Sequence, residues 1–265
     1  MSNTRSFIGF PEGMLRGKPL RLPVIESRPD WYALNKLSGL LGKQHPWFQG
    51  RPDVCSAIRA QLDAGKPELK RLGVTGAYLV YSPEPDIAGP MLFANNSEAG
   101  EFIKNALGSD RLGFDYLMLT EAKVDGSTLH CDLPIGNHRS EARSVVSHRF
   151  GKKSSTTFKK LHESASITLW KASTKLPRMD QIRIHAYEVG IPVFGDRLYA
   201  SDANEIQVWG NKTLRDALRR FSGIGLALTR IDLSAIAVGI AQIEAPLPKP
   251  LELLMNKCGL IYENN

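Results

Sequence analysis

Residues Lys175–Ala200 read KLPRMDQIRIHAYEVGIPVFGDRLYA, and the rest of the chain is best interpreted outward from this stretch. Polar and apolar residues alternate from Gln181 to His185, which is typical of a strand, or of the start of a helix, with one polar and one apolar face. Gly190–Pro192 then indicates a change of chain direction, and Phe194–Arg197 a compact turn. We therefore expect one short regular element followed by turns.

Several side chains of this stretch suit an anionic, hydrogen-bonding ligand. Arg178 and Arg183 carry guanidinium groups, and Gln181 and His185 add further hydrogen-bonding groups beside them. Arginine favours such ligands because its planar group donates several hydrogen bonds in a fixed geometry, and RNA is one such ligand. A strand edge whose charges face water is the alternative interpretation of the same residues.

The composition is that of a globular protein with an excess of positive charge. Of the 265 residues, 42% are hydrophobic and 23% are charged, which fits one large domain or two small ones. The net charge of +7 and the pI near 9.3 favour a polyanionic partner. The three widely spaced cysteines and the scattered histidines show neither a disulfide framework nor metal-ligand spacing, which indicates a reducing compartment.

The chain contains no apolar run near the length of about 18 residues that a membrane helix requires. We therefore expect no membrane partner and a cytoplasmic location. Residues 1–21 are basic and rich in glycine and proline, and they are predicted to form an arm along the surface. Because this arm lacks an apolar signal core, organelle targeting stays open only as a weaker alternative.

Apolar periodicity predicts many short strands and a few helices. The turn signal Ser27–Asp30 separates two predicted strands within Leu22–Leu41, and Phe102 is placed on the inner face of a helix. Further strands are expected at residues 77–80, 90–94, 116–121, 129–133, 224–233 and 238–243, and helices at 53–62, 97–107, 213–221 and 250–258. Because strands and helices do not alternate regularly, we predict an α+β fold with a mainly antiparallel sheet.

The fixed spacings within Lys175–Ala200 resemble the late motif of the RluA family of RNA pseudouridine synthases, which is close to TGRTHQIRVHL, a short helix, and GHPIVGDxLYG. The matching positions are Arg178, Gln181, Ile182, Arg183, His185, Gly190, Pro192, Gly195, Asp196, Leu198 and Tyr199. Met179 and Asp180 depart from the pattern, which has threonine and histidine there. A match over so many fixed spacings makes the resemblance specific.

Other segments extend the resemblance over about Leu22–Leu260. Asn35–Leu40 resembles the family's NKPxGLL, with Leu37 in place of the proline, and the turn Ala245–Pro248 with the final helix resembles its ending. The resemblance implies one synthase domain, residues 22–262, with the pseudouridine-synthase catalytic fold, a curved and mainly antiparallel sheet with flanking helices and a central cleft. It also implies structured RNA (rRNA or tRNA) as the partner, without cofactor or metal, and we expect a monomer.

The family's essential group is one aspartate in a motif close to HRLDRDTSGLLLFAK, with which Tyr81–Asn95 aligns without gaps as YSPEPDIAGPMLFAN. Glu84 stands at the position of the essential aspartate, and Asp86 matches the second acid. Ser82 replaces the family's arginine, and Ile87-Ala88 replaces its Thr-Ser pair. Since glutamate is one methylene longer, the reacting oxygen can move by about an ångström, which can cost on the order of 100-fold in rate.

The resemblance also assigns the remaining site residues. The predicted catalytic residues are Glu84, Tyr116, which stacks on the flipped base, and Arg183, which pairs with the carboxylate and keeps it ionised. The predicted cleft or base-binding residues are Asp86, Arg178, Gln181, Ile182 and His185. The predicted RNA-backbone contacts are Lys36, Arg143, Arg149, Lys152, Lys153, Lys159 and Lys160. The alternatives are a core tyrosine, a structural ion pair and a solvated basic surface.

Three functional hypotheses follow from these residues. The first is an active synthase that uses Glu84 on a uridine flipped out of structured RNA. The second is an RNA-binding pseudoenzyme of the same fold, acting as an RNA chaperone or assembly factor, which four changes in one loop favour slightly. The third is a cleft that now binds a protein partner, against which the lysine and arginine content argues mildly.

Overall fold

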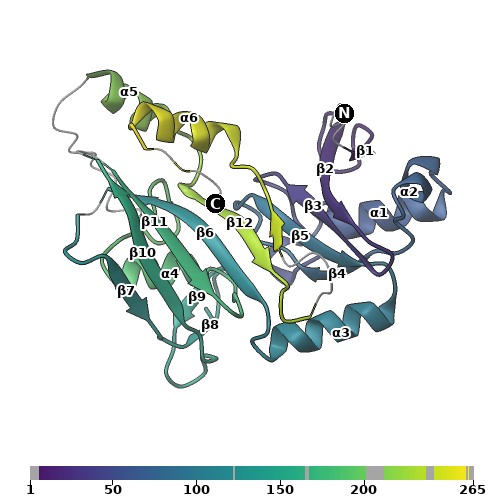
Figure 1. Cartoon of the computed structure of the whole chain (residues 1–265), viewed down its shortest axis with the longest axis horizontal. Coiled ribbons are helices and arrows are strands. Elements are labelled where there is room, and N and C mark those ends of the chain that lie inside the picture. The colour runs from purple at the N-terminus through teal and green to yellow at the C-terminus, as the bar shows by residue number, and fades with distance from the viewer. Residues whose placement is uncertain are drawn as a thin grey trace. The chain divides into compact units, whose positions relative to one another are not determined.

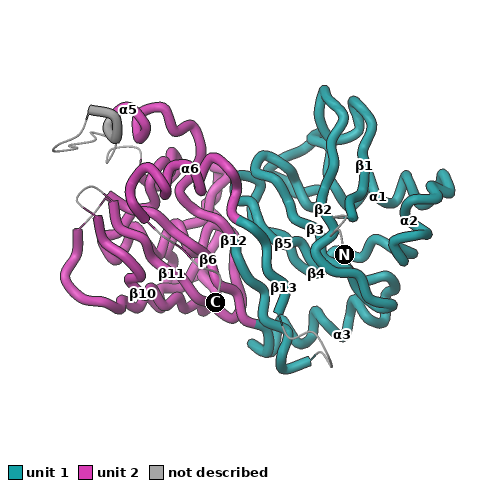
Figure 2. Tube along the Cα trace, turned by 45° about the horizontal axis from the view of Figure 1, so that its top comes forward, with its two compact units in different colours: residues 1–112, 228–246 teal, residues 113–227, 247–265 magenta. Residues whose placement is uncertain are grey.

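The computed structural model of the chain describes residues 6–121, 123–164, 167–200, 212–236, 242–260 and 262. The chain divides into two compact units, and each unit is built from two separate segments (Figure 2). Unit 1 comprises Met1–Leu112 and Leu228–Pro246, and unit 2 comprises Gly113–Ala227 and Leu247–Asn265. The boundary between Ala227 and Leu228 therefore falls inside one strand, β12 (Leu226–Asp232).

Unit 1 contains a five-stranded antiparallel sheet in the order β1-β2-β3-β5-β4 (Figure 1). Its strands are β1 (Phe7–Phe10), β2 (Leu20–Ser27), β3 (Trp31–Lys36), β4 (Tyr78–Tyr81) and β5 (Gly89–Ala94). All residues of β5 are buried, as expected of an inner strand. β12 pairs with β13 (Gln242–Glu244) in register Ile231 to Ile243.

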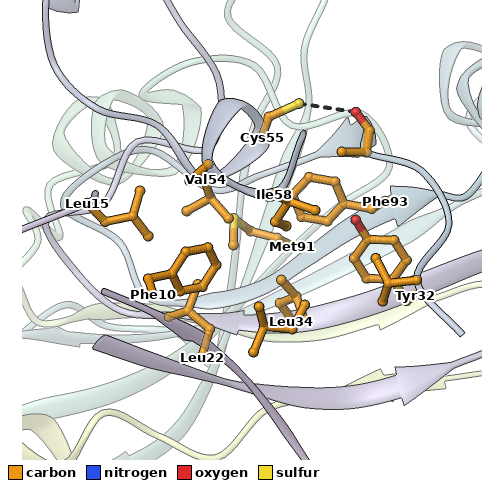
Figure 3. Close-up of a cluster of buried hydrophobic side chains, with 14 of the residues drawn as sticks. Phe10, Leu15, Leu22, Tyr32, Leu34, Val54, Cys55, Ile58, Met91 and Phe93 are labelled. Atoms are coloured by element: carbon orange, nitrogen blue, oxygen red, sulfur yellow. Dashed lines mark hydrogen bonds between the residues drawn. The ribbon is translucent and has the colours of Figure 1, made fainter. Parts of the chain in front are cut away.

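The hydrophobic core of unit 1 joins this sheet to helix α1, Val54–Asp63 (Figure 3). Most of its side chains come from β1, β2, β3, β5 and α1, and the Tyr32 and Phe93 rings stack within it with centroids 5.1 Å apart. Asp53 accepts a hydrogen bond from Ser56 N–H at 2.9 Å and so caps the helix, which confirms the predicted start. The 3₁₀ helix η1 (Pro46–Phe48) and helix α2 (Pro67–Arg71) complete this part of the chain.

The described part of the segment predicted to be an arm along the surface, residues 6–21, contributes to this core. β1 pairs with β2, and its Ile8 and Phe10 are buried, as is Leu15. The sequence pattern did not predict these buried residues, because the glycines and prolines of the segment leave only short apolar runs between them. The predicted single domain over residues 22–262 stays a prediction.

Helix α3 (Ser97–Gly108) confirms the predicted helix but not all of its inner face. Ile103 and Ala106 are buried, whereas Phe102 is 54% exposed, so the prediction for Phe102 is wrong. Gly100 is buried instead, and a Cβ built there would lie 3.4 Å from Tyr78 and 3.6 Å from Ala94. The helix approaches the sheet closely at this glycine, which turns Phe102 outward.

Unit 2 contains a second antiparallel sheet in which β7, β10, β11 and β6 are successive neighbours. Its strands are β6 (Gly113–Thr120), β7 (Thr128–Cys131), β10 (Thr156–Glu163) and β11 (Thr168–Thr174). β8 (Ile135–Asn137) and β9 (Ser144–Val146) form a separate two-stranded hairpin. Helices α5 (Lys212–Arg220) and α6 (Lys249–Lys257) pack against each other in the same unit.

The opening stretch of sequence forms helix α4, Gln181–Glu188, which packs against β7, β9 and β10. Ile184 N–H donates to Asp180 O at 3.0 Å and begins the helical ladder. The alternation of polar and apolar residues does not mark two faces, because every side chain from Gln181 to Ala186 is buried.

Helices and antiparallel strands in both units confirm the predicted α+β class. Among the described residues, no helix has the length and apolarity needed to cross a membrane. The three cysteines, Cys55, Cys131 and Cys258, are buried free thiols.

Gly89, the first residue of β5, is expected to tolerate no side chain. Its φ is 141°, and a Cβ built there would lie 2.2 Å from Leu228 O. We predict that Gly89→Ala lowers the free energy of unfolding by about 3 kcal/mol, through backbone strain and this clash. Denaturant unfolding measures the change. Gly108→Ala is the matched control, because no atom lies within 4 Å of its Cβ, and it should be neutral or stabilising by up to about 1 kcal/mol. Equal unfolding midpoints for the two variants would contradict this prediction.

Candidate active site and RNA-binding residues

The predicted nucleophile Glu84 lies in a fixed turn between β4 and β5 of unit 1. Ile87 N–H donates to Glu84 O at 3.0 Å and closes the turn Glu84–Ile87. Pro83 and Pro85 flank the glutamate and fix φ on either side of it. The Glu84 side chain is half-buried, whereas Asp86 is exposed.

Lys36 connects this turn to the end of β3. Its side chain is fully buried, and its Nζ donates to three carbonyl oxygens, Pro85 O at 3.0 Å, Leu40 O at 3.2 Å and Leu37 O at 3.4 Å. Three acceptors match the three N–H donors of an ammonium group, which must be satisfied when it is buried. The expectation that Lys36 contacts RNA phosphates is therefore wrong, because its charge is used inside unit 1.

Two further hydrogen bonds hold the same turn. Gly39 N–H donates to Pro85 O at 2.7 Å, and Ser38 Oγ donates to Asp86 O at 2.7 Å. Gly39 has a φ of 84°, a conformation that glycine adopts without strain. Together with Lys36, these contacts attach the turn to the segment that follows β3, and they fix the backbone that carries the Glu84 carboxyl group.

Lys36 and the acids of the turn are also coupled electrostatically. Burial lowers the pKa of the Lys36 ammonium to about 7, while the carboxylates of Glu84 and Asp86 oppose this change and the charges of Arg16 and Arg51 add to it. Because this interaction is mutual, the charged lysine also stabilises the ionised form of a nearby carboxyl group. Lys36 therefore supports Glu84 both by geometry and by charge.

The residues that replace the family's arginine, threonine and serine are accommodated without polar contacts from their side chains to Glu84. Ser82 Oγ donates to Pro83 O at 2.9 Å. Ile87 and Ala88 are buried, and Leu228 N–H donates to Ala88 O at 2.9 Å. Backbone hydrogen bonds and apolar burial thus hold the turn where the family motif has hydroxyl and guanidinium groups.

Tyr116 lies on β6 of unit 2, opposite Ala172 of β11, with only 1% of its surface exposed. Phe114, two residues earlier on the same strand, is equally buried. Between them, Asp115 accepts a hydrogen bond from Ser173 Oγ at 2.5 Å. Whether Tyr116 stacks on a flipped base stays a prediction.

Arg183 is held near the start of α4 by two aspartates of unit 2. Its Nε donates to Asp196 Oδ2 at 2.8 Å, its Nη2 donates to Asp196 Oδ1, and its Nη1 lies 3.4 Å from Asp180 Oδ1. These three side chains are at most 6% exposed. A two-point contact between guanidinium and carboxylate fixes the plane of the guanidinium group, so Arg183 is oriented within its own unit.

Asp180 links Arg183 to the hairpin of β8 and β9. Its Oδ2 accepts hydrogen bonds from Tyr199 OH at 2.9 Å and from Ser144 N–H at 3.1 Å. Burial raises the pKa of the Tyr199 hydroxyl, and the Asp180 carboxylate raises it further, so Tyr199 remains a donor. This role was not predicted from the sequence, because Asp180 departs from the family motif. The available signal was its position three residues before Arg183, the spacing of an ion pair within a helix.

Gln181 and His185 are structural rather than base-binding residues. Both are 0% exposed, and His185 lies with one ring nitrogen 2.9 Å from Thr156 Oγ1 and the other 2.9 Å from Leu133 O. Burial lowers the pKa of His185 and favours its neutral ring. Gln181 Nε2, which has two N–H donors, lies 3.0 Å from each of three acceptors, Ser155 O, Thr156 Oγ1 and Thr174 Oγ1. The prediction that these two residues bind a base is wrong, because unit 2 uses their polar groups.

The other predicted base-binding residues differ in exposure. Ile182 is 3% exposed, and its predicted place among the base-binding residues stays a prediction. Arg178 is half-buried, and its Nε donates to Lys153 O at 2.9 Å. Of the five predicted residues, Arg178 and Asp86 keep part of their side chains at the surface.

The predicted RNA-backbone residues of unit 2 form two groups. Arg143 and Lys160 are half-buried, and each pairs with a glutamate, Glu141 at 2.5 Å and Glu163 at 2.7 Å. The second group consists of residues whose side chains are exposed to solvent, Arg149, Lys152, Lys153 and Lys159. The second group is therefore the better candidate for contact with phosphates.

The strands and helices described above have the pseudouridine-synthase fold. The structure is similar to that of human RNA pseudouridylate synthase domain containing 4, with a TM-score of 0.70 and 16% identity, over 91% of this chain and 94% of that chain. It is also similar to human RNA pseudouridylate synthase domain containing 1, with a TM-score of 0.60 and 18% identity, over 89% and 87%. At these identities the likeness establishes the fold.

Comparison of amino-acid sequences identifies individual proteins to which this chain is similar. The chain is 26% identical over 250 residues to the uncharacterized RNA pseudouridine synthase YlyB of Bacillus subtilis, which covers 93% of this chain and 76% of the relative. It is 25% identical over 263 residues to ribosomal large subunit pseudouridine synthase D of Haemophilus ducreyi, covering 95% and 76%. No family model matches the chain. The chain is thus similar to RNA pseudouridine synthases along nearly its whole length.

Proposed function

We propose that the chain is an RluA-type RNA pseudouridine synthase that isomerises uridine in structured RNA, with Glu84 as the catalytic carboxylate. The isomerisation breaks the glycosidic bond between C1′ and N1 of uridine and forms a bond between C1′ and C5. C5 loses its proton and N1 gains one, so the reaction is redox-neutral. The resemblance assigns Tyr116 to the flipped base and Arg183 to the catalytic carboxylate, and the proposal adopts these roles.

The observation that carries this proposal is the fixed turn of Glu84. Lys36, Gly39 and Ser38 hold the backbone of Pro85 and Asp86 through hydrogen bonds of 2.7–3.0 Å. A carboxylate can act on a reacting carbon only when its carrier is held in place, because small displacements are costly in rate. The turn is held in place although it lacks the family's arginine, threonine and serine. This supports the proposal that its carboxylate still acts in catalysis.

An RNA substrate agrees with the charge of the chain. The net charge is +7, and the exposed members of the predicted RNA-backbone residues of unit 2 lie within residues 149–159. The Haemophilus relative carries a ribosomal name, which supports rRNA as the substrate, with tRNA as the alternative. We place the protein in the cytoplasm, where these RNAs are modified.

The second candidate function is an RNA-binding pseudoenzyme that acts as an RNA chaperone or assembly factor. The observation that favours it is the chemistry of the turn itself, in which the carboxylate is one methylene longer and Ile87 and Ala88 bring no hydroxyl group. Such a protein would bind RNA with the same salt dependence but would leave uridine unchanged.

Release of the C5 proton separates these two functions. We expect the purified protein, incubated with unmodified rRNA transcripts containing C5-tritiated uridine, to release tritium well above a no-protein control. Salt-sensitive binding of the same transcripts is measured in parallel. Binding without tritium release would replace the synthase by the pseudoenzyme, and neither binding nor release would overturn both.

A further inference from the structure

Phe150 is the most exposed large hydrophobic side chain among the described residues, with 64% of its surface accessible. It lies in unit 2, in the turn that follows β9. A single exposed aromatic residue is ordinary on a protein surface, so exposure alone suggests no function. The neighbours of the ring and the rigidity of its backbone make Phe150 different.

Two arginines lie against the Phe150 ring. The guanidinium carbon of Arg149 is 4.9 Å from the ring centroid, and that of Arg139 is 5.9 Å away. Both distances lie in the range in which a cation is attracted to an aromatic face. Lys152 and Lys153 follow in the chain and are also exposed, so the segment that carries the ring holds further positive charge.

The turn that carries Phe150 is fixed by its own hydrogen bonds. Phe150 N–H donates to Ser147 Oγ at 3.1 Å, and Gly151 N–H donates to Ser147 O at 2.8 Å. Ile135 and Lys152 exchange backbone hydrogen bonds of 3.0 and 2.8 Å. A Cβ on Gly151 would lie 2.3 Å from Ser147 O, so the backbone packs too closely here for any other residue. The ring is therefore presented in a defined place.

We propose that Phe150, Arg139 and Arg149 form a stacking platform for an unpaired base of the RNA, additional to the uridine that is isomerised. The base stacks on the Phe150 ring and displaces a guanidinium group from its face, and the two arginines contact the phosphates on either side of the base. The proposal rests on the proposed function in that it takes RNA as the ligand.

The chemistry of the platform favours a single-stranded nucleotide over other partners. Aromatic rings and arginines together are the groups that bind unpaired bases, because every base has a face that stacks and a phosphate that attracts cations. A paired base offers no free face to an exposed ring on a turn. The platform should therefore distinguish a loop from a duplex, which basic side chains alone do not.

The test compares the binding of two probes by fluorescence anisotropy, a fluorescein-labelled RNA hairpin with an unpaired loop and the fully paired duplex of its stem. Phe150→Ala is expected to weaken hairpin binding by roughly 5- to 100-fold and to leave duplex binding and the salt dependence unchanged. Arg149→Gln is expected to lower the salt slope for the hairpin by about 1, because it removes one phosphate contact.

Two further variants show that stacking, and not folding, is responsible. Phe150→Trp should restore hairpin binding, and the added indole fluorescence should be quenched by the hairpin but not by the duplex. Phe102→Ala is the matched control, since Phe102 is 54% exposed in unit 1 and no arginine stacks on its ring among the described residues. It should bind both probes like the wild type.

Each outcome decides the proposal. Equal loss of hairpin and duplex binding in Phe150→Ala, or no loss at all, overturns the platform while RNA binding by the wild type keeps the proposed function. A wild type that binds neither probe at low salt overturns the RNA partner itself and the platform with it. Selective loss for the hairpin with rescue by tryptophan supports it.

Discussion

Glu84→Gln is expected to abolish pseudouridine formation while RNA binding persists. The variant keeps the size of the side chain and removes the negative charge, so the turn held by Lys36 stays in place. Because the carboxylate is proposed to act directly at the reacting sugar or base, its loss should lower kcat by roughly 10³-fold or more. Tritium release from C5-labelled uridine measures the rate, and anisotropy with the same RNA measures binding.

Asp86→Asn is the matched control for this experiment. Asp86 lies in the same turn and is exposed, so its replacement removes one charge near Glu84 without removing the proposed catalytic group. It should keep kcat within a few fold, and the loss of its predicted contact with the base would appear in KM for the RNA. If Glu84→Gln kept full activity, or if Asp86→Asn were the inactive variant, the catalytic role would not belong to Glu84.

Glu84→Asp tests the extra methylene in the same assay. The family's acid is an aspartate, and the fixed turn offers it the same backbone position. A higher rate would show that side-chain length alone limits this site. A lower rate would show that the turn has adapted to glutamate.

Lys36→Met is expected to have a large effect on activity, although Lys36 touches no substrate in the proposed mechanism. Methionine fills the space of the lysine stem but cannot donate to the carbonyl groups of Pro85, Leu40 and Leu37. The turn of Glu84 then loses one of its attachments, and a displacement of about 1 Å should lower kcat on the order of 100-fold. KM for the RNA should change little, because Lys36 is buried.

The same variant should reveal the buried charge through the pH dependence of stability. Burial lowers the folded-state pKa of Lys36 to about 7 from an ordinary value of 10.5, so the unfolded chain binds more protons between these two values. The free energy of unfolding of the wild type should therefore rise, relative to that of Lys36→Met, as the pH increases from 7 toward 10. Below pH 7 the difference should be constant.

Urea unfolding at several pH values measures this difference. Lys43→Met is the matched control, since Lys43 is exposed in the same unit and the variant replaces a lysine by methionine without removing a buried amine. The pH dependence of its stability should run parallel to that of the wild type. Parallel curves for Lys36→Met as well would mean that Lys36 keeps an ordinary pKa, and the coupling to Glu84 would have to be abandoned.

The regular elements were largely predictable because their signals are local. The cap at Asp53, the apolar spacing of α1 and the turn between β2 and β3 each depend on residues within a few positions of one another. The turn of Glu84 was predictable as a rigid loop for the same reason, because Pro83 and Pro85 restrict their own backbone.

The roles of the polar residues were less predictable because burial depends on distant segments. His185 bonds to Leu133, 52 positions away, and Lys36 bonds to Pro85, 49 positions away. Sequence spacing identified both as special but could not distinguish a ligand-binding side chain from one that satisfies buried backbone groups. The resemblance to a family carried the same ambiguity, since a motif preserves structural residues as faithfully as catalytic ones.

The division of each unit between two stretches of chain has a consequence for synthesis on the ribosome. Unit 1 needs Leu228–Pro246 for its β12–β13 pair, and unit 2 needs Leu247–Asn265, which includes α6. When the ribosome has added Leu112, unit 1 still lacks its second segment. All of Gly113–Ala227 must be synthesised before that segment follows. Neither unit can complete its fold before its second segment is synthesised, and a chain truncated before α6 should leave apolar surface exposed for chaperones to bind.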